Sequence, residues 1–190
     1  MVAKISVGNS LYGALAYNGE KINEAQGRLL TTNRIYNDGS GTVDINKAME
    51  GFHTFLPPQM KVEKPVVHIS LNPHPDDMEL QNIAREYLEK LGFGNQPYLV
   101  FKHEDIDRHH LHIVTVRVDE NGKCISDKNN YYRSKQITRE LEKKYELSLR
   151  FLCFAHGWHV YRNGHLPACG YILRSLQYRH GRNVTFHIHI

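Results

Sequence analysis

The pattern of hydrophobic and polar residues along the chain predicts five short strands. They lie at 3–7, 65–71, 98–101, 113–118 and 124–126. In the first strand apolar and polar residues alternate, whereas the second, third and fourth are mostly apolar. The fifth follows Asn121-Gly122, a dipeptide typical of hairpin turns. Because the third and fourth strands are separated by a short polar stretch, we expect them to be neighbours in the sheet.

Helical periodicity and capping residues predict four helices between these strands. They span about 11–18, 45–56 and 77–91, and a fourth begins at Ser134. The polar residues 19–43 are interpreted as a loop or a short helix. The resulting order predicts an α+β fold, with a mainly antiparallel sheet and helices packed against it.

A histidine-rich stretch connects the two neighbouring strands. Side chains alternate between the faces of a strand, so His110 and His112 point the same way. A turn near 107–108 would bring His103 beside them, and three imidazoles on one face predict a divalent metal site. Asp105 is close enough to His103 to orient an imidazole or to accept a proton. The alternative interpretation is a solvated hairpin that happens to be rich in histidine.

Length and composition limit the classes of protein. At 190 residues the chain is long enough for one domain with a core of its own. It has neither an apolar run of roughly 20 residues nor a secretory signal, so we expect a cytoplasmic protein without membrane insertion. The three cysteines are widely spaced and imply no disulfide framework. The net charge of +4 is a weak argument for nucleic-acid binding.

The composition changes near residue 149. Residues 151–190 contain no Asp, Glu or Lys, although about a quarter of residues are charged in an average protein. We therefore predict a domain over residues 1–148 and an atypical segment over 149–190, which we interpret as a truncated or frame-shifted end. His187 and His189 repeat the spacing of the ligand pair but have no acidic partner, and we treat them as a coincidence.

Two motifs resemble those of the relaxases, the plasmid and transposon mobilization nucleases of the histidine–hydrophobe–histidine superfamily. His103-x-Asp105, followed after four residues by His110-x-His112, is similar to their third motif. Residues 11–18 are similar to their first motif, with Tyr17 in the place of the nucleophile. Tyr12 lies roughly 140° from Tyr17 around a helix and stays an alternative. The resemblance covers about residues 1–148 and implies a five-stranded sheet with the histidine-rich strand at its centre.

The resemblance implies an enzyme that nicks DNA at an origin of transfer and starts conjugative mobilization. Tyr17 would form a 5′-phosphotyrosine, while His103, His110 and His112 hold Mg²⁺ or Mn²⁺ and Asp105 assists. Single-stranded DNA, accessory mobilization proteins and the conjugative secretion machinery are the implied partners. The alternatives are a replication initiator of the same superfamily, a metal-dependent hydrolase without a covalent intermediate, and a noncatalytic DNA-binding module with a structural metal.

Candidate DNA contacts come from polar stretches outside the motifs. They are Arg28, Asn33, Arg34, Arg108, Asn130, Tyr131 and Arg133. The first three could contact phosphates or belong to a solvated loop. The aromatic stretch around Tyr131 could stack on bases or simply precede the next helix. His68 is a secondary candidate for the metal site, with a satisfied buried histidine as the alternative.

Overall fold

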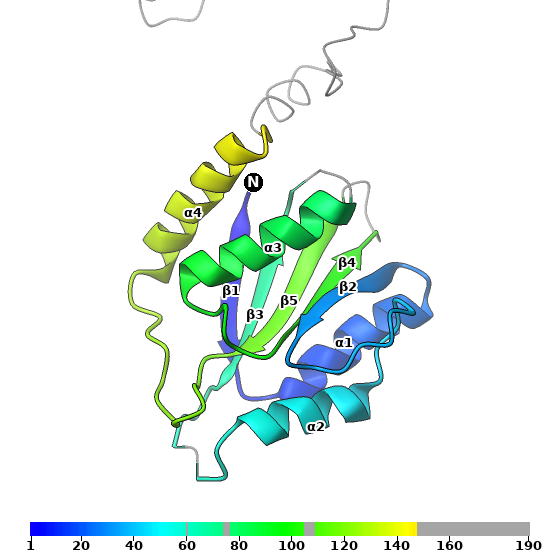
Figure 1. The fold of residues 1–190 in the computed structure, drawn as a ribbon, viewed down its shortest axis with the longest axis vertical. Coiled ribbons are helices and arrows are strands. Elements are labelled where there is room, and N and C mark those ends of the chain that lie inside the picture. The colour runs from blue at the N-terminus through cyan, green and yellow to red at the C-terminus, as the bar shows by residue number, and fades with distance from the viewer. Residues whose placement is uncertain (60, 74–76, 105–108, 148–190) are drawn as a thin grey trace, which may run out of the picture.

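The computed structural model describes residues 1–59, 61–73, 77–104 and 109–147, and they form an α+β fold (Figure 1). The strands are β1 (Ala3–Gly8), β2 (Gly27–Asn33), β3 (Val66–Leu71), β4 (Tyr98–His103) and β5 (His110–Val116). The helices are α1 (Leu11–Asn23), α2 (Ile45–Phe55), α3 (Asp77–Leu91) and α4 (Asn130–Lys144).

The five strands form one sheet in the order β1-β3-β5-β4-β2, and every neighbouring pair is antiparallel. The histidine-rich strand β5 is therefore central, as expected. Its residues Ile113 and Val114 are fully buried because helices cover both faces of the sheet. The predicted fold class and the pairing of β4 with β5 are confirmed.

Two apolar clusters assign the helices to opposite faces. On one face, Leu15 of α1 and Phe52 of α2 pack with Phe101 and Val114. On the other face, residues of α3 and α4 pack with alternate positions of β3, β4 and β5, such as Leu111. Figure 1 shows α3 lying across that second face. Full burial of a side chain such as Leu15 contributes about 1.5–3 kcal/mol, so these contacts hold α1 firmly on the sheet.

The prediction of a loop or short helix over residues 19–43 was wrong in two places. Helix α1 continues to Asn23, and residues Gly27–Asn33 form the edge strand β2, paired with β4. A bulge between Leu29 and Thr31 interrupts the regular alternation of this strand. An edge strand with polar residues has a weak local signal, and pairing with the buried strand β4 decides its conformation.

The prediction of a return strand at 124–126 was also wrong. Within the described residues this region makes only an isolated bridge between Val118 and Cys124. The Asp119 side chain accepts hydrogen bonds from the backbone N–H groups of Asn121 and Lys123, which closes a compact turn. Backbone pairing across this turn ends where the N–H of Ile125 donates to the carbonyl oxygen of Arg117, so it is too short to make a strand.

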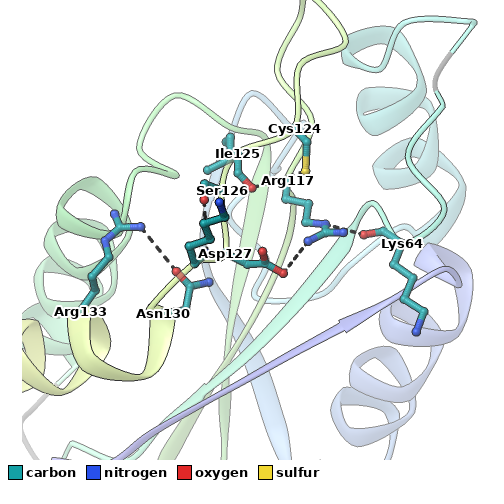
Figure 2. Close-up of polar contacts among 9 residues, drawn as sticks. Lys64, Arg117, Cys124, Ile125, Ser126, Asp127, Asn130 and Arg133 are labelled. Carbon is teal, nitrogen blue, oxygen red and sulfur yellow. Dashed lines mark hydrogen bonds and ion pairs between the residues drawn. The ribbon is translucent and has the colours of Figure 1, made fainter.

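Helix α4 begins four residues earlier than the predicted start at Ser134. Asn129 precedes it in the left-handed conformation, with φ 57°. In the first turn, the Arg133 side chain donates to Asn130. In the loop before the helix, the Asp127 carboxylate accepts from Arg117, which also donates to the carbonyl oxygen of Lys64 (Figure 2). Asn130, Tyr131 and Arg133 therefore lie on a helix and not in a loop before it.

Several predictions lie outside the described residues. These are the turn at 107–108 and the segment 149–190 with its histidine pair. Among the helices of the described chain, none is long and apolar enough to cross a membrane.

Candidate metal centre and nucleophile

The register of the central strands brings the three predicted ligands together. His103 at the end of β4 is the Cα partner of His110 at the start of β5. His112 is paired with Phe101 on β4, and Phe101 belongs to the apolar cluster beneath α1 and α2. Side chains that are directly opposite in a sheet share a face, so all three imidazoles lie on the α1 side.

The three rings form a compact group. Ring centroids are 4.3 Å apart for His103 and His112, 5.0 Å for His110 and His112, and 5.4 Å for His103 and His110. One nitrogen from each ring lies within 4.8 Å of the other two. Nitrogens that share one ion at roughly 2.1 Å lie at most about 4.2 Å apart, so a small inward movement completes the site. The residues therefore fit a divalent metal.

Tyr17 is the tyrosine that lies beside this cluster. Its ring centroid is 6.0 Å from that of His103 and 6.0 Å from that of His112. Leu15 and Asn18 are fully buried on the inner face of α1, and Tyr17 lies on the flank of that face, 45% exposed. Tyr12 is 61% exposed, and the described residues give it no ring contact with the cluster. The Tyr17 hydroxyl is thus accessible to a substrate near the three histidines.

His68 on β3 is bonded to the cluster. Its Nε2 lies 2.8 Å from Nδ1 of His112, with ring centroids 4.8 Å apart. Burial lowers the pKa of His68, and the positive charge of Lys4 on β1 lowers it further. The neutral form is favoured for both reasons, and a neutral imidazole can accept a hydrogen bond from His112.

Gly27 at the start of β2 lies in close contact with the backbone of β4 and the ring of His103. A Cβ at this position would lie 2.8 Å from the carbonyl oxygen of Lys102 and 3.1 Å from Cδ2 of His103. A glycine lets the two backbones approach, so β2 supports the His103 ring from outside. Sequence reasoning missed this residue, because it lies in the segment interpreted as a loop.

His109 is directed away from the cluster. Its Nδ1 lies 3.1 Å from Oε1 of Glu104, the same oxygen that lies 2.6 Å from Nζ of Lys102. The hydrogen bond from Lys102 lowers the pKa of Glu104 and keeps this carboxylate charged. Asp105 and Arg108 follow in the chain but lie outside the described residues.

Most of the candidate DNA contacts near the N-terminal half have structural partners. The Asn33 side chain donates to the carbonyl oxygens of Gly94 and Gln96, at 3.3 and 2.7 Å. The Arg34 guanidinium lies 5.5 Å from the ring centroid of Phe55. The register pairs Arg28 with Lys102, which places Arg28 on the face opposite to the histidines.

The candidates on α4 differ from one another in exposure. Arg133 is half-buried and donates to the backbone carbonyl oxygen of Leu91 at 2.7 Å. Asn130 accepts from Arg133 at 3.5 Å (Figure 2). Tyr131 is 72% exposed and available to a ligand.

A row of residues across the sheet was not predicted from the sequence. Lys4 on β1 is the Cα partner of Ser70 on β3, and Ser70 is the partner of His112. Alternation within each strand shows which residues share a face of that strand. Only the pairing register between the strands shows that Lys4, Ser70 and His112 lie in one row.

Comparison with known proteins identifies the family of the chain. The family model described as Relaxase, MobA/VirD2-like, nuclease domain matches residues 17–147. No curated protein matches the chain. A solved structure described as the molecular basis of vancomycin resistance transfer in Staphylococcus aureus is 15% identical, with a TM-score of 0.37 over 88% of this chain and 100% of that chain. The family model matches more than half of the residues of this chain, and the chain therefore belongs to the MobA/VirD2-like relaxase nuclease family.

Proposed function

We propose that this protein nicks one DNA strand at an origin of transfer, with Tyr17 as the nucleophile. The observation that carries the proposal is the position of the Tyr17 ring, 6.0 Å from two of the three clustered histidines. A nucleophile beside a group of metal ligands is the arrangement that phosphoryl transfer requires. The cut would start conjugative mobilization.

In the proposed reaction, the Tyr17 oxygen attacks the scissile phosphorus and forms a new P–O bond. The bond from phosphorus to the 3′ oxygen breaks, and that oxygen leaves and takes up a proton. The 5′ phosphate stays joined to Tyr17 as a phosphotyrosine, so the step is reversed when a 3′ hydroxyl attacks it. Free tyrosine has a pKa of about 10, so the phenol needs a proton acceptor. Asp105 is our candidate for that acceptor, by its place in the motif.

His103, His110 and His112 would hold the divalent ion, which we propose to be Mg²⁺ or Mn²⁺ in use. A divalent ion supplies positive charge next to a nonbridging phosphate oxygen. Three imidazoles are also a ligand set that suits zinc and other late transition metals, so the identity of the metal must be measured. The buried His103 keeps one side of the site dry.

The proposed setting is the cytoplasm, with single-stranded DNA as the substrate. Accessory mobilization proteins would expose the strand, and the conjugative secretion machinery would receive the covalent complex. A replication initiator would use the same chemistry on a different DNA sequence.

The test is a covalent adduct between the protein and labelled oligonucleotides that span the flanking origin of transfer, incubated with Mn²⁺. Wild-type protein should give a shifted band that survives boiling in detergent. Tyr17→Phe removes only the hydroxyl, so the adduct should disappear while the fold persists. Tyr12→Phe is the matched control and should still form it.

Two results would contradict the proposal. If Tyr12→Phe abolishes the adduct and Tyr17→Phe does not, the nucleophile is Tyr12. If both variants cleave DNA without any adduct, the protein is a hydrolase that activates water.

A further inference from the structure

We infer that a groove between β1 and α4 binds the single-stranded DNA that flanks the reacting phosphate. The inference rests on the proposed function, which supplies the strand. The groove has a volume of about 680 Å³. Its two sides are formed by residues 1–7 along β1 and by residues 127–142 at and within α4, and Figure 1 shows α4 beside β1.

Three cations line the groove: Lys4, Lys135 and Arg139. All three are exposed, and within the part of the chain that the structure describes none has an ion-pair partner. The register puts the side chain of Lys4 on the histidine face of the edge strand β1, whereas Lys135 and Arg139 belong to α4. Three exposed positive charges along the rim of one groove attract a polyanion, and phosphate groups are the dominant electrostatic partners of such surfaces.

The acidic residues of the groove do not cancel this charge. Asp127 is ion-paired with Arg117 at 2.7 Å. Glu142 is ion-paired with the amino group of Met1. Both carboxylates are therefore neutralised by cations other than Lys4, Lys135 and Arg139, so a net positive charge remains in the groove.

One exposed aromatic residue, Tyr131, lines the groove, and Tyr132 lies next to it on α4. Tyr131 and Tyr132 are each 72% exposed, and their rings meet edge to face with centroids 5.5 Å apart. Tyr131, Lys135 and Arg139 recur at intervals of four residues, so they share one face of α4. Aromatic rings beside a line of cations are the arrangement that binds single-stranded nucleic acid, with bases on the rings and phosphates on the cations.

The row of paired residues connects this groove with the metal site. Lys4 lines the groove, its partner Ser70 lies next along the row, and His112 follows. Strands in a sheet are about 4.8 Å apart, so the backbones of Lys4 and His112 are separated by about 10 Å. Because α4 packs on the opposite face of the sheet, a strand that leaves the reacting phosphate would cross Ser70 and Lys4 on the histidine face and then pass round the edge strand β1 into the groove.

A peptide strand is a less suitable occupant, although β1 is an edge of the sheet. Lysine on an edge strand is one of the devices by which proteins prevent pairing with another strand. The cations Lys4, Lys135 and Arg139 favour an anionic ligand, and a peptide backbone carries no charge. Single-stranded DNA satisfies both the charges and the exposed tyrosines.

The test measures binding of a labelled oligothymidylate of about 30 nucleotides, in EDTA, between about 50 and 200 mM salt. For single strands, each lost phosphate contact lowers the slope of log K against log salt by about 0.7, so Lys4→Ala/Lys135→Ala/Arg139→Ala should lower it by about 2. Tyr131→Ala should weaken binding about tenfold without changing the slope. Thermal melts check that each variant is folded.

The control is Lys61→Ala/Arg85→Ala/Lys123→Ala, which removes three exposed cations that do not line the groove. It changes the net charge equally and should leave the slope unchanged. The inference is overturned if the slope of log K against log salt falls equally in both triple variants. It is also overturned if the slope does not fall in the groove variant. Because EDTA prevents metal-dependent cleavage, wild-type binding without any later adduct would contradict the proposed function alone. If wild-type protein binds no single-stranded DNA, both fail.

Discussion

Nδ1 of His112 lies 2.8 Å from Nε2 of His68, and this bond joins the central strand to its neighbour β3. A neutral imidazole carries its proton on one nitrogen only. When His112 donates from Nδ1 to His68, its Nε2 keeps a lone pair for a metal. The hydrogen bond to His68 therefore selects the tautomer and the ring orientation of His112 that a metal ligand needs.

His68→Ala should weaken Mn²⁺ affinity by about 10- to 100-fold, the usual effect of removing a group that orients a ligand. His68→Gln should restore most of the affinity, because its side-chain oxygen can accept the same hydrogen bond. Calorimetry measures the affinity, and nitrogen NMR of the metal-free protein reports the His112 tautomer. Unchanged affinity and an unchanged tautomer in His68→Ala would refute this role.

Removal of the ligands themselves should have a larger effect. His110→Ala or His112→Ala should abolish Mn²⁺ binding, and His103→Ala should weaken it strongly, because three neutral imidazoles share one ion. His53→Ala is the control, since His53 is exposed on α2. Calorimetric titration is the measurement, and normal affinity in His112→Ala would disprove the site.

Gly27→Ala should disturb the proposed metal site from the edge strand β2, which pairs with the strand that carries His103. The added Cβ would meet the Lys102 carbonyl oxygen at 2.8 Å and the His103 ring at 3.1 Å. Overpacking of this kind costs about 1–3 kcal/mol of stability, and here it also displaces a ligand. We expect a lower melting temperature and weaker Mn²⁺ binding. Gly8→Ala is the control, because nothing lies within 4 Å of its added Cβ; equal behaviour of the two variants would contradict the prediction.

The metal-free protein should lose stability as the pH falls below about 6.5, the ordinary histidine value. Burial lowers the pKa of His68, and Lys4 on β1 adds to this, while His112 on β5 is its hydrogen-bonding neighbour. The unfolded chain therefore binds the proton first, and one such group changes the free energy of unfolding by up to about 1.4 kcal/mol per pH unit. His68→Gln should flatten the profile in urea titrations with EDTA. Parallel profiles for the two proteins would argue against it.

A shortened chain of residues 1–148 should fold cooperatively and bind Mn²⁺. Both apolar clusters of the described chain are formed by residues up to Leu147, which packs with α3 and α4. Thermal melting and calorimetry are the measurements. If the cooperative melt is lost, Phe151, Phe154 and Trp158 are required to complete the core.

The sequence alone determined the histidine-rich hairpin, because local geometry controls it. Alternation within a strand puts His110 and His112 on one face whatever the rest of the chain does. Their proximity in sequence to His103 made the pairing of β4 with β5 predictable, and the central place of β5 came from family resemblance. The roles of Tyr17 and Asp105 stay predictions: the Tyr17 ring lies near the cluster, and Asp105 lies outside the described residues.

Only the tertiary structure decided which residues from distant segments lie beside that hairpin. Strand β2 has too weak a local signal to be recognised, so Gly27 and its contact with His103 were missed. The bond from His68 and the row from Lys4 through Ser70 depend on the register of strands far apart in sequence. The position of Tyr17 depends on how α1 packs on the sheet through Leu15. Such contacts arise from packing and register across the whole domain, which local periodicity does not encode.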